Sequence, residues 1–300
     1  MPVYKGTTEI ASGKLYKGTT EVDKVYKGTS LVYEKTVPPI GIEFLFAAGG
    51  GNDGTVGGGG GGGLLTSWGS TQVGGQPLPS TIDLDAIAGI SYSVTIGAAT
   101  QNTTLIRVNS NDGTQTTILE ADAGGNGGSP GNGASASYSA GGGTGGSGGG
   151  AGGVGNANNY SQFSASGGGA TAGQGFSGGG VSIYRGTYGG GGGGATGAGT
   201  GMSTSSTNFQ SYGYGAGGAG LSSDITGTSL WYSQGGAGGG GGTPQTTRVN
   251  SGDKGQAGVG ILRMTTAIFN GATLTGTYTT NVVSSDTIII WTGNGSIAFA

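Results

Sequence analysis

Uninterrupted runs of glycine are the feature that most constrains how this chain can fold. Residues 57 to 63 are all glycine, and glycine makes up 78 of the 300 residues. All but eight of these glycines lie between residues 41 and 265. Glycine has no side chain to bury, and it loses more backbone freedom on folding than any other residue. A conventional hydrophobic core is therefore excluded over most of this region.

The rest of the composition removes several classes of function. The chain has no histidine and no cysteine, so a disulfide framework, a cysteine- or histidine-ligated zinc site and a histidine-based catalytic triad are excluded. A net charge of −3 disfavours nucleic-acid binding. No run of 18 apolar residues occurs, and the first residues lack an apolar signal core. We therefore expect no cofactor, no membrane insertion and no secretory signal.

Residues 1–40 contain a threefold internal repeat. Val3–Ile10 returns as Leu15–Val22 and again as Val25–Val32. Each copy predicts two short strands around a Lys-Gly turn, because glycine tolerates the positive φ of a tight hairpin. A unit this small cannot bury an apolar face alone. We predict an attachment or assembly region, with a partly flexible β tail as the alternative; the candidate attachment residues are Tyr4, Tyr16, Tyr26 and Tyr33.

Ordinary strand patterns occur at intervals along the chain. Apolar or alternating stretches at 42–48, 91–96, 105–108 and 116–119 predict strands, and Asn111-Asp112-Gly113 predicts a hairpin turn. The spacing around this turn does not fit a calcium-binding loop. Residues 266–300 predict a C-terminal β segment. The expected organisation is an N-terminal region at 1–40, a glycine-rich domain at 41–265 and this C-terminal segment, with almost no α-helix.

Glycine blocks alternate with short aromatic loops between residues 124 and 242. Such blocks can adopt the extended polyglycine II helix, which has three residues per turn and no internal hydrogen bonds. Without side chains these helices can approach closely, so that N–H and C=O groups bond between neighbours. We predict a packed bundle of such helices with β strands at its ends. A flexible Gly/Ser linker is the competing interpretation.

Four stretches carry a family resemblance, in the family's order. They are Glu43–Gly51, Tyr92–Gly97, Gly217–Gly227 and Gly258–Leu262. Together they resemble the glycine-rich domain of bacteriophage tail-fibre proteins, over about residues 41–265. The Tyr-Lys-Gly-Thr repeats resemble N-terminal β repeats of phage virion proteins, and Ile288–Phe299 is similar to the β endings of phage fibres. The chain departs from the family after Gly97, where a longer β insertion begins.

The resemblance implies a virion structural protein, a tail-fibre or fibre-tip adhesin exposed on the particle. Its partners would be other virion proteins (fibre shaft, tail or capsid) and a host cell-surface receptor. The resemblance favours a homotrimer, because fibres are usually trimeric, and leaves a monomer as the alternative, because T-even adhesin tips of this glycine type are monomers. A head-fibre or capsid decoration protein and a self-assembling extracellular filament are the alternatives. The resemblance also implies that loops between the glycine helices contact the host receptor.

Aromatic and polar residues suit such loops, because tyrosine and tryptophan offer a large contact area at small entropic cost. The loops with this composition are 156–166, 202–214 and 228–234. The alternative is that their aromatic side chains turn inward and cap the glycine bundle. The candidate receptor contacts are Tyr160, Phe163, Tyr184, Tyr188, Phe209, Tyr212, Trp231 and Tyr232.

Catalysis is not expected. A glycosidase needs two carboxylates at a defined separation, and only Asp83 and Asp85 are predicted to share a strand face. The sequence places no further acid opposite them, so a solvated acidic surface is the preferred interpretation.

Overall fold

The computed structural model describes most of the chain. The described residues are 3–5, 8–10, 16–17, 20–21, 24–27, 30–34, 40–77, 80–87, 89–130, 138–155, 163–183, 186–203, 213–240 and 251–299. Strand residues make up 44% of the structure and helical residues 3%. Within the described residues the α-helix content is one short element, α1 (Thr266–Phe269). The prediction of a mainly β fold with almost no α-helix is confirmed.

The N-terminal repeats form three antiparallel hairpins, each a separate two-stranded sheet. The prediction of two strands per repeat is confirmed. The candidate attachment residues Tyr4, Tyr16, Tyr26 and Tyr33 lie in β1, β3, β5 and β6, and their side chains are outside the described part. The hairpins are β1 (Val3–Lys5) with β2 (Thr8–Ile10), β3 (Tyr16–Lys17) with β4 (Thr20–Glu21), and β5 (Lys24–Lys27) with β6 (Ser30–Glu34).

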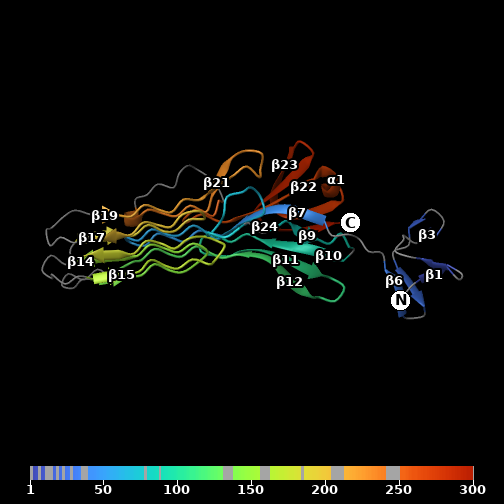
Figure 1. Ribbon diagram of the computed structural model, residues 1–300, viewed down its shortest axis with the longest axis horizontal. Helices are drawn as coiled ribbons and strands as arrows, with labels where there is room; N and C mark the ends of the chain where they lie inside the picture. Colours follow the sequence, from blue (N-terminus) through green and yellow to red (C-terminus); the bar gives the residue numbers. More distant parts are fainter. Residues whose placement is uncertain are drawn as a thin grey trace.

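A nine-stranded sheet, called the main sheet below, forms one end of the body (Figure 1). Its order is β12-β11-β10-β24-β22-β7-β8, with β23 paired to β24 and β9 to β7. The boundary predicted after residue 265 assigns β22 to the glycine-rich domain and β24 to the C-terminal segment. In the structure these two strands are antiparallel neighbours in the same sheet. The strands are β7 (Ile40–Ala47), β8 (Leu64–Thr66), β9 (Ile82–Leu84), β10 (Ile90–Thr95), β11 (Thr103–Asn109), β12 (Gln115–Ala121), β22 (Val259–Thr265), β23 (Ala272–Val283) and β24 (Asp286–Phe299).

Both faces of the main sheet are buried where β24 crosses its centre. Ile289 and Trp291 contribute to a first apolar cluster with Phe44 on one face. Ile288 belongs to a second cluster, with Leu45, on the other face. Successive side chains of a strand point to opposite faces, so the continuous apolar run in β24 can supply both clusters. The side-chain core of the protein is thus concentrated around this sheet.

Glycine-rich segments run side by side from the main sheet to the far end of the body (Figure 1). Backbone hydrogen bonds join neighbouring segments at every third residue. The N–H groups of Gly57, Gly60 and Gly63 donate to the carbonyls of Gly128 (3.1 Å), Gly125 (2.8 Å) and Asp122 (2.7 Å). A β-ladder has a two-residue period and an α-helix bonds within itself. The three-residue repeat is the one that a polyglycine II helix has.

The glycines between these positions bond in other directions. Gly58 and Gly61 donate to the carbonyls of Gly190 (3.0 Å) and Gly193 (2.9 Å), and Gly62 donates to Gly252 (2.7 Å). One segment is therefore tied to three different neighbours. We call residues 48–63, 122–128, 141–151, 167–180, 189–201, 215–220, 233–238 and 251–256 the glycine lattice.

The interior glycine positions of the lattice have no room for a side chain. A Cβ on Gly124 would lie 2.5 Å from Gly51 N, 2.5 Å from Gly60 O and 2.6 Å from Gly61 O. Backbone atoms of this kind cannot move aside as a flexible side chain can. Close packing of main chains here takes the place that interdigitated side chains have in an ordinary core.

One ion pair lies within the lattice. Lys254 Nζ is 2.5 Å from Asp53 Oδ2, and the two side chains are 10% and 22% exposed. Asp53 Oδ1 also accepts a hydrogen bond from the N–H of Gly59 (2.8 Å). This contact fixes the lattice segment 48–63 to the segment 251–256, whose Lys254 lies 201 residues further along the chain than Asp53.

Two small sheets close the far end of the body. One has the order β13-β14-β17-β19 and the other β15-β16-β18. Ala151, Val181, Ile183 and Tyr188 form a third apolar cluster there. The strands are β13 (Tyr138–Ala140), β14 (Gly152–Gly155), β15 (Phe163–Ala165), β16 (Val181–Ile183), β17 (Gly186–Gly189), β18 (Met202–Ser203) and β19 (Gly213–Tyr214). The 3-10 turn η1 (Gly238–Gly240) packs against β17 and β19, and the hairpin of β20 (Leu221–Ser223) with β21 (Leu230–Tyr232) lies elsewhere.

Candidate functional site

The far end brings together the flanks of two predicted recognition loops. β14 ends at Gly155 and β15 begins at Phe163, and these two strands bracket most of loop 156–166. β18 ends at Ser203 and β19 begins at Gly213, at either side of residues 204–212. The labelled strands β14, β15 and β19 lie at the same end of the body (Figure 1). Both loops therefore leave and re-enter the described structure at this end, opposite to the main sheet.

The third cluster of apolar side chains holds these strands together. Phe163, Ala165 and Met202 pack against its buried members. β16 pairs antiparallel with β15 and parallel with β18, so that Val181 lies beside Ala165 on one side and Met202 on the other. This small core is what positions the ends of the two loops relative to each other.

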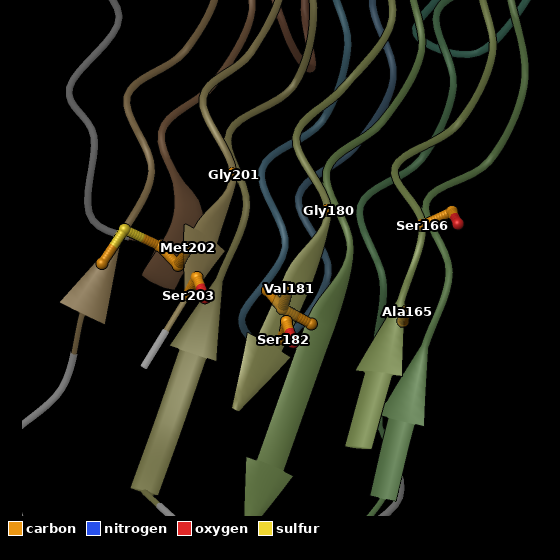
Figure 2. A pocket seen from close by; sticks show the side chains of 8 residues that line it. All are labelled: Ala165, Ser166, Gly180, Val181, Ser182, Gly201, Met202 and Ser203. Carbon is orange, nitrogen blue, oxygen red and sulfur yellow. The ribbon is translucent and has the colours of Figure 1, made fainter. Parts of the chain in front are cut away.

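A shallow groove of about 350 Å³ opens beside β15, β16 and β18 (Figure 2). Ala165 and Met202 contribute apolar atoms to its lining, and Val181 is buried in the third cluster. Ser166, Ser182 and Ser203 add hydroxyl groups, which can both donate and accept hydrogen bonds. No side chain that lines it is charged. The full lining is Ala165, Ser166, Gly180, Val181, Ser182, Gly201, Met202 and Ser203. Such a surface suits an uncharged polar ligand or a weakly charged protein surface, and it offers no acid–base pair.

The aromatic candidates divide into three groups. Phe163 is half-buried and Tyr188 buried in the third cluster, while Tyr232 is buried in the second cluster beside the main sheet. Tyr188 and Tyr232 therefore point inward in this structure and present almost no side-chain surface. Trp231 is 45% exposed, because alternation along β21 turns it away from Tyr232. Tyr160, Tyr184, Phe209 and Tyr212 lie outside the described residues.

The third predicted loop, 228–234, is separate from the other two. It contains β21, which pairs with β20, and Tyr232 and Leu230 pack with the second apolar cluster. Because that cluster lies against the main sheet, Trp231 belongs to another part of the surface than the groove. The sequence predicted three loops of similar composition, and the structure places the flanking strands of only two of them, 156–166 and 202–214, at the far end of the body.

Tyr214 is a surface aromatic that the candidate residues omitted. Its side chain is 45% exposed at the end of β19, and its ring covers Gly239, whose φ of 82° requires glycine. The sequence could have indicated this residue, because Tyr214 lies in the predicted loop 202–214, two residues after the candidate Tyr212.

Asp83 and Asp85, the two carboxylates considered as a catalytic pair, lie in and next to β9 of the main sheet, away from the groove. Asp85 is paired with Arg107 at 2.7 Å, and Asp83 is exposed on β9. Hydrogen bonds from the hydroxyl and N–H of Thr114 hold the pKa of Asp112 below its usual range. In the described part of the chain, no three carboxylates gather in a way that could hold a metal ion.

Comparison with known proteins adds no relative: no family model matches the chain, and neither a curated protein nor a solved structure matches it significantly. The described residues also contain no helix that is both long and apolar enough to span a membrane.

Proposed function

We propose that the chain is a bacteriophage virion structural protein, a tail-fibre or fibre-tip adhesin. In this proposal the N-terminal hairpins attach it to other virion proteins, and the segments 156–166 and 202–214 contact a host surface glycan or outer-membrane protein. The observation that carries the proposal is that both segments emerge at one end of a hydrogen-bonded glycine lattice, while the chain enters from the N-terminal hairpins at the other end through β7.

The physical properties of the lattice support a spacer role. Its segments bond laterally through main-chain groups, as Gly57, Gly58 and Gly60 illustrate, so bending the body would break several hydrogen bonds at once. We propose that these segments are polyglycine II helices, in line with the three-residue repeat of their partners. A stiff body keeps recognition segments away from the attachment region and limits the entropy that they lose on binding.

The groove supports the choice of ligand. It combines hydroxyl groups of Ser166, Ser182 and Ser203 with apolar atoms of Ala165 and Met202. Sugars present both hydroxyl groups and C–H faces, so an uncharged glycan matches this lining. The aromatic and amide side chains in the sequence of the two neighbouring segments, such as Asn159 and Tyr160, extend the same chemistry.

Replacement of the two segments tests the proposal. We expect variants in which 156–162 or 204–212 is exchanged for a Gly/Ser sequence of equal length to lose at least about tenfold in binding to host cells. The measurement is adsorption of the labelled chain to a panel of bacterial strains, or of particles carrying the variant. Ser203→Trp, which fills the groove, is expected to weaken binding in the same direction.

The matched control exchanges the exposed hairpin turn 110–114, at the main-sheet end, for a Gly/Ser sequence of equal length. This variant is expected to adsorb like the parent chain. Unchanged adsorption and unchanged host range of both segment variants, in chains that remain folded, would contradict the assignment of this end as the recognition surface.

A further inference from the structure

The strand β23 forms a long free edge of the main sheet. It runs over Ala272–Val283 and pairs along its length with β24. In the described part of the chain, no backbone hydrogen bond joins β23 to any other segment. Its outer N–H and C=O groups are therefore available to another strand, which makes this edge a template for pairing.

The other ends of the main sheet are protected and β23 is not. β8 contains only Leu64–Thr66. β12 carries the charged Glu120, and the side chain of Gln174 covers part of it by donating to the carbonyl of Glu120 (3.1 Å). Short length, charge and cover are the usual protections of an edge. β23 is longer, has no charged residue and no proline, and exposes Tyr278 (37%) and Val282 (61%).

Residues 275 to 282 of β23 are exposed on both faces of the strand, and Tyr278, Thr280 and Val282 share one of these faces. Tyr278 is paired with Trp291, Thr280 with Ile289 and Val282 with Thr287. Trp291 and Ile289 belong to the first apolar cluster, so Tyr278, Thr280 and Val282 continue the apolar face of that cluster to the edge. There the face ends without cover.

This edge is complementary to itself. If two copies pair antiparallel about Thr280, Tyr278 of one copy stands opposite Val282 of the other, and the same contact occurs twice. Aromatic and β-branched residues form favourable cross-strand pairs. Thr279 then stands opposite Asn281, and no like charges meet because β23 is uncharged. A Lys or Glu at position 280 would face the same charge in the second copy.

We propose that β23 is a docking edge for a second copy of this chain, and that two copies form one continuous sheet through antiparallel β23 pairing centred on Thr280. The contact is isologous and closes at two subunits. The assembly proposed here is a dimer, which differs from both the homotrimer and the monomer that the resemblance allows. The proposal does not depend on receptor binding, because the edge lies at the main-sheet end of the body.

The test measures the mass of the purified chain in solution by light scattering and sedimentation over a dilution series. The parent chain is expected to be dimeric at high concentration. Thr280→Lys places two lysines opposite each other and is expected to raise the dimer dissociation constant at least about tenfold. Thr117→Lys, the same change at an exposed position of β12, is the control and is expected to leave the dimer unchanged.

A charge exchange tests the register. Tyr278→Glu combined with Val282→Lys puts opposite charges across the interface and is expected to retain the dimer. Tyr278→Lys combined with Val282→Lys puts like charges across it and is expected to give monomers. Circular dichroism establishes that each variant is folded. A parent chain that is monomeric, trimeric or filamentous, or a Thr280→Lys variant that dimerises as tightly as the parent, would overturn the proposal.

Discussion

We expect Gly124→Ala to lower the free energy of unfolding by about 3 kcal/mol, the upper range for overpacking a well-packed interior. The added methyl group would lie between Gly51 N, Gly60 O and Gly61 O, all at 2.6 Å or less. These atoms belong to main chains that are hydrogen-bonded to their neighbours, so relieving the overlap requires the segments to separate. Urea-induced unfolding, followed by circular dichroism, measures the change.

Gly169→Ala is the matched control in the same kind of segment. Gly169 is exposed, and nothing lies within 4 Å of a Cβ built on it. Its φ is not in the left-handed region, so alanine is tolerated and stiffens the unfolded chain. Stability is expected to stay the same or to rise by up to about 1 kcal/mol. If Gly124→Ala is as stable as Gly169→Ala, the interior of the lattice is not close-packed.

Asp53→Asn is expected to cost about 2 kcal/mol. The amide keeps the shape of the carboxylate and can still accept from the N–H of Gly59, but it leaves the ammonium group of Lys254 without its counter-charge. Removing one partner of a fully buried pair costs about 3–5 kcal/mol, and the partial exposure of Asp53 reduces this figure. The change is read from the midpoint of thermal unfolding at pH 7.

Asp85→Asn provides the comparison for a more exposed pair. The side chains of Arg107 and Asp85 are 28% and 34% exposed, and pairs of this kind contribute less than about 1 kcal/mol. We therefore expect the loss at Asp53 to exceed the loss at Asp85. Equal losses would mean that the lattice does not shield the pair between Asp53 and Lys254 from solvent.

The strands of the main sheet could be predicted from local pattern. Alternation at 91–96 and the Asn111-Asp112-Gly113 turn give β10 and the β11–β12 hairpin, which the structure contains. The repeats gave the N-terminal hairpins in the same way. These elements depend on neighbours in the sequence, where residue type and spacing carry the information.

Contacts between distant segments could not be predicted. Nothing in a run of identical glycines indicates that Gly58 bonds to Gly190 while Gly57 bonds to Gly128. Positions without side chains do not differ in residue type, so the sequence cannot distinguish their partners. The pairing of Asp53 with Lys254 depends on this arrangement. For the same reason the sequence did not separate the buried Tyr188 and Tyr232 from the exposed Trp231, since all three occur in similar aromatic loops.

Amide hydrogen exchange of Gly57–Gly63 tests most directly whether a bonded glycine lattice replaces a side-chain core. We expect the amides of Gly57, Gly58, Gly60 and Gly61, which donate across the lattice, to exchange at least about a thousandfold more slowly than in an unfolded peptide. The exposed Gly69 is the internal reference and is expected to exchange fast. Exchange of the lattice amides at the rate of Gly69 would contradict the account.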